Sequence, residues 1–331
     1  MRQERRRKQH KKRLFIYIIS TFVVCMGLGL GWFYFTDSGF QLRKMIAGSI
    51  LSSQHPQYAK WFLSDAEIQK LNAAIHMPPS ERSNAVEAFA AQSDLNVSVD
   101  TVETANYTAK VMKVNDPTTI HLVSSRLKDQ GQPLSDLIKE NGAVAGINAG
   151  GFQDTNGVGR GGTVIGIVIG DGVVHSEPGF DKNTRYLVGG FTKKGQFITG
   201  SYSINELENM GVTQAISFGP QLLVDGKDAV TDEVESGYGW APRTAIGQDA
   251  QGNVIMIATD GRFYWNKQHR GASMNDMVKL FKKYNCVNAF ALDGGGSTTM
   301  INQGELQLKP ATDTAVGMRY LPNAFVVIPH K

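Results

Sequence analysis

Two glycine-bearing loops contain the residue types that are best suited to chemistry. The longer one follows an apolar run and reads Asp293, Gly294, Gly295, Gly296 and Ser297. A carboxylate at a strand end can transfer protons, and glycines let backbone N–H groups approach an oxyanion or a phosphate. The alternative is a merely flexible turn, but a turn needs one glycine, and three of them cost backbone entropy. We therefore predict that Asp293 is catalytic and that the four residues after it bind substrate.

The second loop, Asn148-Ala149-Gly150-Gly151-Phe152, also follows an apolar run. An amide side chain at the strand end is followed here by two residues whose backbone a ligand can approach closely. Loops on a rigid scaffold are where binding residues concentrate. We predict that Asn148, Gly150 and Gly151 bind substrate.

Two arginines lie beside predicted strand ends. Arg243 and Thr244 begin an apolar strand, and Arg319 and Asn323 bracket the loop that leads into the last strand. An arginine in such a place can bind a phosphate through two parallel hydrogen bonds. We predict substrate binding by all four residues.

A second strand-end carboxylate, Asp260, opens a polar and aromatic loop that contains Tyr264, Trp265 and His269. Paired carboxylates with opposed pKa values carry out general acid–base catalysis at a glycosidic centre. We predict that Asp260 is catalytic together with Asp293 and that His269 binds substrate. The two aromatic residues either stack on a sugar or pack under the loop. The sequence contains no Gly-x-Ser-x-Gly elbow and no His-Glu-x-x-His motif.

A repeated order of elements would position these loops. Hairpin, helix, apolar strand, glycine-bearing loop and second hairpin follow one another three times. The predicted elements are first hairpins over Tyr107–Ser124, Arg185–Thr199 and Thr244–Thr259; helices over Leu134–Glu140, Ser203–Met210 and Ser273–Tyr284; strands over Ala143–Ile147, Val212–Phe218 and Val287–Leu292; second hairpins turning at Asp171-Gly172, Asp225-Gly226 and Gln303-Gly304; and a last strand, Asn323–Ile328.

The spacing of the helices favours a true repeat over a chance order. Leu137, Leu207 and Met277 occupy equivalent helical positions 70 residues apart each time. We predict an α+β fold: a β-rich domain of three repeated units whose strand-end loops converge, with Asn148, Gly219 and Asp293 on one face.

The N-terminus has the pattern of a membrane anchor. Residues 1–13 hold eight basic residues and one acid, and Leu14–Phe35 follows with 22 uncharged residues. At 1.5 Å per residue the run spans about 33 Å, enough for a hydrocarbon core of about 30 Å. Because cationic flanks stay in the cytoplasm, we predict a single-pass cell-membrane protein with a cytoplasmic tail at 1–13, a transmembrane helix at 14–35 and an extracellular remainder. The alternative is a cleaved secretory signal, whose apolar region is usually shorter.

The rest of the chain divides into a stalk, 36–100, read as a helical spacer and packing strap, and a catalytic domain, 101–331. The formal net charge is +4, and because the tail supplies +7 of it, the remainder is near −3. The basic pI is therefore no sign of a nucleic-acid partner. Of two cysteines, Cys25 lies in the apolar run and Cys286 in the domain, so the exported part has neither a disulfide nor a cysteine-based zinc site.

The motif series resembles that of the phosphodiester glycosidase family, which includes the uncovering enzyme and bacterial exopolysaccharide-related members. The resemblance covers about residues 105–329 and departs from the usual family pattern at Ala149, Gln153 and Tyr320. The motifs are Asn148–Phe152, Arg243–Gly247, Asp260–Arg262, Leu292–Met300, Arg319 and Asn323-Ala324.

The resemblance implies hydrolysis of a sugar-1-phosphodiester in an envelope glycan, an exopolysaccharide or a teichoic-acid-like polymer. Arg243 would clamp the phosphodiester, and Asp293 and Asp260 would share acid and base roles in an order left open, as is the choice between C1–O and O–P cleavage. We expect no cofactor, although a divalent cation stays possible. The alternatives are a non-catalytic surface glycan-binding protein, which would tolerate loss of both aspartates, and a metal-dependent phosphodiesterase, which a chelator would inhibit.

Overall fold

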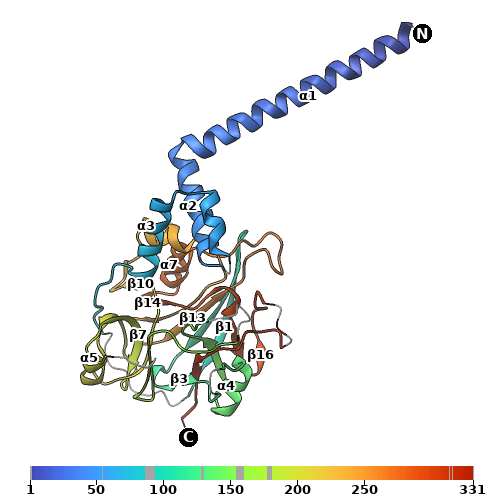
Figure 1. The fold of residues 1–331 in the computed structure, drawn as a ribbon. Helices are drawn as coiled ribbons and strands as arrows, with labels where there is room; N and C mark the ends of the chain where they lie inside the picture. The colour runs from blue at the N-terminus through green and yellow to red at the C-terminus, as the bar shows by residue number, and fades with distance from the viewer. Residues whose placement is uncertain are drawn as a thin grey trace.

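The structure, a computed structural model, describes residues 2–53, 55–85, 94–127, 130–153, 160–176, 181–312, 314 and 316–330. A long helix, α1 (Arg2–Phe35), leaves a β-rich body, and the C-terminus lies at the end of the body away from it (Figure 1). The body contains three antiparallel sheets with helices beside them. The predicted combination of an N-terminal apolar helix with a mixed helix-and-sheet fold is confirmed.

The largest sheet has seven strands. Their order is β1 (Val97–Glu103), β2 (Thr108–Val114), β13 (Val254–Thr259), β12 (Thr244–Asp249), β14 (Cys286–Leu292), β10 (Gln221–Val224) and β11 (Lys227–Asp228). The three central strands are buried along most of their length, which suits the mainly apolar sequences of β13 and β14; β12 also buries the polar residues Thr244, Gln248 and Asp249.

The other two sheets have five strands each. The second runs β16 (Glu305–Leu306), β15 (Met300–Asn302), β4 (Ala145–Asn148), β17 (Asn323–Val327) and β3 (Ile120–Ser124). The third runs β6 (Val173–Ser176), β5 (Ile167–Gly170), β9 (Val212–Ser217), β7 (Tyr186–Thr192) and β8 (Phe197–Tyr202).

One strand order occurs in all three sheets. The second sheet (β16-β15-β4-β17-β3), the third sheet (β6-β5-β9-β7-β8) and five strands of the first sheet (β11-β10-β14-β12-β13) correspond strand by strand. In each sheet the last-named strand is followed along the chain by a helix. These helices are α4 (Leu134–Glu140), α5 (Ile204–Asn209) and α7 (Met274–Lys283). The pairing shows a shared order; superposition of three complete units stays a prediction.

The predicted first hairpin, Tyr107–Ser124, is wrong. β2 pairs with β1 and β13, whereas β3 pairs with β17 in a different sheet. Pro117 opens a short 3-10 turn, η2 (Pro117–Thr119), capped by Asp116, and this turn takes the chain out of the first sheet. The C-terminal strand β17 therefore has the place beside β3 and β4 that β7 and β12 have in the other two sheets.

The core lies between the sheets. One cluster draws buried side chains from all three, among them Met112, Phe191, Phe290 and Phe325. Separate clusters lie beneath the helices, with α7 over the first sheet, α4 over the second and α5 over the third. The central strands of each sheet are thus buried on both faces, and the strand-end loops are held by a rigid scaffold.

The segment read from the sequence as a helical spacer and packing strap, residues 36–100, packs against the body in its described part. It forms α2 (Asp37–Leu51), η1 (Pro56–Trp61) and α3 (Asp65–His76). α2 and α3 lie against α6 (Asp232–Tyr238), and η1 packs on α2 and α3. A Cβ on Gly48 would meet Ser236 O, so the two helices touch through their backbones. The predicted boundary at residue 100 also falls inside β1.

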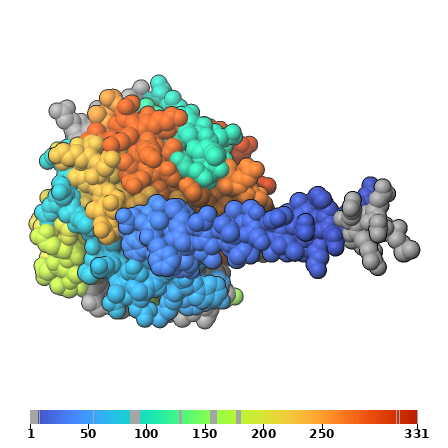
Figure 2. Space-filling model, turned by 90° about the horizontal axis from the view of Figure 1, so that it is seen from above, coloured from blue at the N-terminus to red at the C-terminus, as the bar shows by residue number. Residues whose placement is uncertain are grey.

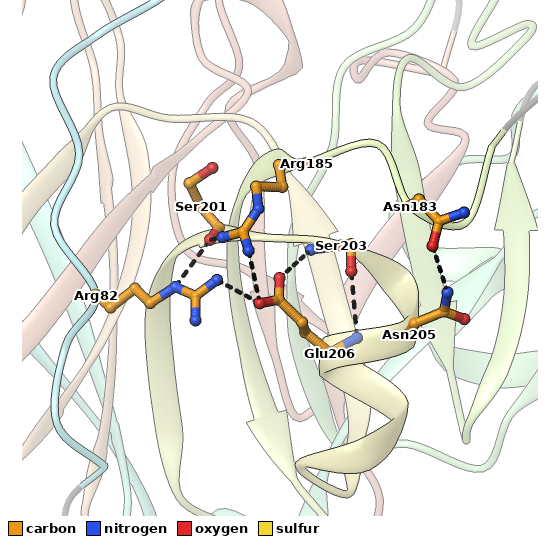
Figure 3. Close-up of polar contacts among 7 residues, drawn as sticks. All are labelled: Arg82, Asn183, Arg185, Ser201, Ser203, Asn205 and Glu206. Atoms are coloured by element: carbon orange, nitrogen blue, oxygen red, sulfur yellow. Dashed lines mark hydrogen bonds and ion pairs between the residues drawn. The ribbon is translucent and has the colours of Figure 1, made fainter.

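After α3 the chain crosses the third sheet and the edge of the first as an extended strap, residues 78–85. Ser83 exchanges hydrogen bonds with Thr199, its N donating to Thr199 O at 2.9 Å and its Oγ accepting from Thr199 N at 2.9 Å. Arg82 contacts Glu206 at 2.7 Å, where Arg185 adds a second ion pair at 2.9 Å (Figure 3). This segment is therefore part of the folded domain.

Candidate active site

Asn148 links the two glycine-bearing loops. Its Nδ2 donates to Asp293 O at 2.6 Å, while its Oδ1 accepts from Thr244 Oγ1 at 2.8 Å and from Thr299 N at 3.1 Å. Asp293 N donates in turn to Ala149 O at 2.9 Å. The predicted meeting of the Asn148 and Asp293 loops is therefore present, but Asn148 uses its amide to hold them together.

The third strand-end loop adjoins the other two. A Cβ on Gly151 would lie 3.0 Å from Phe218 Cε2, and Ala291 N donates to Pro220 O at 2.9 Å. The loop that contains Gly219 therefore packs between the end of β4 and the end of β14.

The glycines of the first loop are required by close packing. A Cβ on Gly150 would lie 2.5 Å from Ile216 Cδ1, and Gly150 N donates to Asn323 Oδ1 at 2.6 Å. Asn323 is fully buried, and its Nδ2 has no hydrogen-bond partner within the described part of the chain. A buried amide donor without a partner is costly, and this one lies beside the first glycine-bearing loop.

The glycines of the second loop let two arginines come close. Gly295 has a φ of +60°, and a Cβ there would lie 3.0 Å from one guanidinium nitrogen of Arg262. A Cβ on Gly296 would lie 3.1 Å from Arg319 Nε, and one on Gly294 would lie 2.7 Å from Pro242 O. Side chains at these positions would displace the arginines or the backbone.

Asp293 lies in a mixed environment of burial and positive charge. Burial raises its pKa to about 6, although the Ser297 hydroxyl, Arg319, the Gly294 N–H and Arg262 all act to lower it. The Thr298 hydroxyl nearby is buried and has no hydrogen-bond partner among the described residues. The result is a carboxyl group that holds its proton to higher pH than a free aspartic acid does and that lies beside two cations.

Arg262 is the site residue that the predicted set omitted. Burial lowers its pKa, Arg319 lowers it further, and Asp293 opposes both, so the three groups form one electrostatic cluster. Its Nη2 donates to Ser52 O at 3.0 Å, which ties the cluster to the end of α2. Its place two residues after Asp260, in the Asp260-Gly261-Arg262 motif, is the sequence signal that identifies it.

Asp260 holds the loop that presents Arg262. Its Oδ1 accepts from Thr108 N at 2.7 Å, and its Oδ2 contacts His269 Nδ1 at 2.8 Å. His269 Nε2 lies 3.0 Å from the Asn266 amide, so both ring nitrogens have partners. Arg262 N donates to Arg270 O at 3.0 Å within the same loop. Asp260 and His269 thus hold the loop that carries Arg262, and Asp293 is the carboxylate beside the arginines. The catalytic role of Asp260 and substrate binding by His269 stay predictions.

Arg243 is also occupied by the protein itself. Its Nη2 donates to Tyr238 O at 2.6 Å and Gly239 O at 2.8 Å, and its Nε donates to Ala272 O at 3.3 Å. Burial lowers its pKa to about 10. Two of its three guanidinium nitrogens thus join the end of α6 to the start of α7, and the two-pronged phosphate clamp predicted at Arg243 is not preformed.

The aromatic loop residues lie at the rim. Trp265 Nε1 donates to Pro310 O at 2.8 Å, and the ring stays about half exposed beneath Lys309. Within the described residues no three His, Cys, Asp or Glu side chains gather as a metal site would require. The absence of a cofactor stays a prediction.

Comparison with known proteins identifies the family. The profile of the family described as phosphodiester glycosidase matches residues 141–328, which is more than half of the chain. Every predicted site residue lies within this range. The resemblance inferred from the motifs is thereby confirmed. The chain is 27% identical over 194 residues to the mouse N-acetylglucosamine-1-phosphodiester alpha-N-acetylglucosaminidase, covering 54% of this chain and 35% of that protein. It is 29% identical over 183 residues to the SPbeta prophage-derived uncharacterized protein YomE of Bacillus subtilis, covering 53% and 26%.

A solved structure supports the fold. The zebrafish N-acetylglucosamine-1-phosphodiester alpha-N-acetylglucosaminidase catalytic domain, auto-inhibited by its pro-peptide, matches with a TM-score of 0.62 and 19% identity. The match covers 76% of this chain and 88% of that one. The chain spans about a third or less of the length of the curated relatives that it matches.

Proposed function

Because the chain belongs to the phosphodiester glycosidase family, we propose that it hydrolyses a sugar-1-phosphodiester with Asp293 as the catalytic carboxyl group. One observation supports this most directly. A carboxyl group whose pKa is raised to about 6 lies in one electrostatic cluster with Arg262 and Arg319, over a run of three glycines.

The two arginines are suited to the phosphodiester. A phosphodiester has one negative charge and two free oxygens, which match the planar donors of a guanidinium group. In this proposal Arg262 and Arg319 bind those oxygens in place of the clamp first predicted at Arg243. The unpartnered Asn323 Nδ2 and Thr298 hydroxyl are then the groups that hydrogen-bond the sugar or the remaining phosphate oxygen.

Asp293 is proposed to act as the general acid. A carboxyl group whose pKa is raised to about 6 keeps a protonated fraction near neutral pH, and this fraction can donate its proton to the oxygen that leaves the sugar. The bound phosphate anion adds a negative charge beside Asp293 and offsets the two arginines, so substrate binding raises the pKa of Asp293 further. Asp260 and His269 support the reaction by holding the loop of Arg262, and the reaction needs no cofactor.

The substrate is proposed to be an envelope glycan, an exopolysaccharide or a teichoic-acid-like polymer outside the cell. α1 is long and apolar enough to span a membrane, a test that a signal sequence also passes. The eight basic residues before the apolar run support a cytoplasmic N-terminus, and the 22-residue length of that run supports an uncleaved anchor. The body that follows α1 would then be extracellular.

The test uses the purified full-length protein with a panel of sugar-1-phosphodiesters. Release of free sugar supports the proposal, and ¹⁸O-labelled water shows whether the label enters the sugar or the phosphate. Asp293→Asn should abolish release but retain binding of the substrate. Release that disappears after dialysis against a chelator and returns with a divalent cation would favour a metal-dependent phosphodiesterase. Binding of glycan without release by any panel member would favour a surface glycan-binding protein.

A further inference from the structure

The end of α1 is joined to the body by a tight corner. Only Thr36 separates α1 from α2, and its side chain caps α2 by accepting from Gly39 N at 3.1 Å. A Cβ on Gly39 would lie 2.3 Å from Trp32 O, so the two helices touch through their backbones here. A flexible linker between the apolar helix and the body is therefore absent.

One arginine fastens this corner. Arg43 Nε donates to Phe33 O at 3.0 Å and its Nη2 donates to Tyr34 O at 3.4 Å, both in the last turn of α1. Its Nη1 donates to Phe62 O at 3.2 Å, at the end of η1. The guanidinium also lies over the ring of Phe40 at 5.2 Å. The end of α1, α2 and the end of η1 are therefore held within the reach of a single side chain.

The short helix η1 presents aromatic rings beside this corner. Trp61 directly precedes Phe62 and is 71% exposed, and Tyr58 is 43% exposed, with the two rings 4.8 Å apart. Phe35, the last residue of α1, is 90% exposed. Figure 2 shows α2 and the segment after it on the face of the body from which α1 departs. Tyrosine and tryptophan with an apolar body and a polar edge concentrate where a membrane meets water.

We propose that Tyr58 and Trp61 of η1 insert into the outer interface of the bilayer that α1 spans, so that the body is attached to the membrane at two points. The partner is the lipid surface itself, because Arg43 holds Phe62, which directly follows Trp61, next to the residues at which the apolar helix ends. This inference rests on the proposed membrane anchoring by α1.

The double attachment determines where the site lies. α2 has 15 residues and is therefore about 22 Å long. It begins at the membrane end of α1, and Ser52, which follows it, accepts the hydrogen bond from Arg262. The catalytic centre is thus held at a short, fixed distance from the lipid, and it acts on phosphodiesters close to the membrane surface.

The experiment measures tryptophan fluorescence of the full-length protein in proteoliposomes whose lipids carry bromine on the acyl chain near the headgroup. The chain has four tryptophans, so Trp61→Phe, Trp32→Phe and Trp240→Phe each remove one of them. We expect Trp61→Phe and Trp32→Phe each to remove a component that brominated lipid quenches. Trp240 lies over Arg270 at 4.1 Å inside the body, so Trp240→Phe should leave the quenched component unchanged.

Two failures are distinguishable. If Trp61→Phe leaves the quenched component unchanged while Trp32→Phe reduces it, α1 is in the membrane and the proposed contact of η1 is wrong. If neither substitution reduces the quenched component, the anchoring itself is wrong. Melting temperatures of the variants in detergent, matched to the parent, show that the exposed ring at position 61 was removed without unfolding the body.

Discussion

Asp293→Asn is expected to stabilise the protein near neutral pH while it removes turnover. Burial raises the pKa of Asp293 from 3.8 to about 6, so the ionised carboxylate is less favourable in the folded chain than in the unfolded one. Two pKa units correspond to about 3 kcal/mol. Because the side chain keeps partial exposure, this figure is the upper limit of what a neutral amide of nearly the same shape would add to the free energy of unfolding.

The stabilisation has a defined dependence on pH. Since the folded-state pKa is the higher one, ionised Asp293 destabilises the protein fully above about pH 6, and the effect fades as the pH falls through 3.8. The difference in unfolding free energy between variant and parent should therefore be greatest at about pH 7.5 and disappear near about pH 3.5. Urea unfolding of the full chain at both pH values measures this difference.

Turnover should change in the opposite direction. Loss of general acid assistance lowers a rate by about 10²–10⁴-fold, which a discontinuous assay of released sugar resolves. Asp65→Asn, at an exposed aspartate on α3, is the matched control and should keep the parent rate. A variant at Asp293 that melts lower than the parent at neutral pH and retains near-normal turnover would show that the carboxylate is structural, and the acid–base proposal would be wrong.

Four other outcomes follow from the geometry. kcat/KM should fall as the pH rises through about 6, where Asp293 of the enzyme without substrate loses its proton. A kcat/KM that rises over this pH range would make Asp293 the general base. Arg262→Lys should raise KM by about tenfold or more, because an ammonium group cannot form two parallel hydrogen bonds, with the exposed Arg126→Lys as control; an unchanged KM argues against the clamp. Arg243→Lys should mainly lower the melting temperature, since its guanidinium joins three backbone carbonyls; a raised KM with unchanged stability would restore it as a ligand residue. The hydrogen bond from Arg82 holds the pKa of Glu206 down to about 2 (Figure 3), so the stability that ionised Glu206 contributes is present above pH 4.5 and is lost as the pH falls toward 2. Glu206→Gln should therefore weaken the dependence of the melting temperature on pH between about pH 5 and 3. An unchanged pH dependence would contradict the pairing of Glu206 with Arg82.

The sequence predicted the loops of the site better than the roles of single residues. Glycine runs at strand ends can be recognised because each glycine costs backbone entropy, so a run of them indicates a close approach of neighbouring groups. The meeting of the Asn148 and Asp293 loops followed from the repeated order of elements. The first hairpin could not be predicted in the same way, because β3 takes its partner β17 from the other end of the chain. Sequence distance between paired strands is not encoded in local patterns.

The roles of the polar residues depend on which partners are already present. Asp260 and Arg243 have suitable chemistry, yet neighbouring backbone groups and His269 satisfy most of their hydrogen bonds. Asp293 differs because burial, rather than a partner of its own, dominates its pKa. Which hydrogen-bonding groups already have a partner depends on tertiary packing. Residue type and spacing alone therefore predicted the same catalytic role for Asp260 and Asp293.

The candidate site draws its residues from several parts of the body. Asp293 leaves β14 of the first sheet, Asn323 begins β17 of the second, and the loop before α7 supplies Arg262. The segment first taken for a spacer adds Ser52 O, which positions that arginine. Because the pKa of Asp293 depends on burial and on two arginines from different loops, any rearrangement of α2 against the body alters both phosphate binding and proton transfer. The same segment that joins the body to α1 therefore also sets the electrostatics of the catalytic centre.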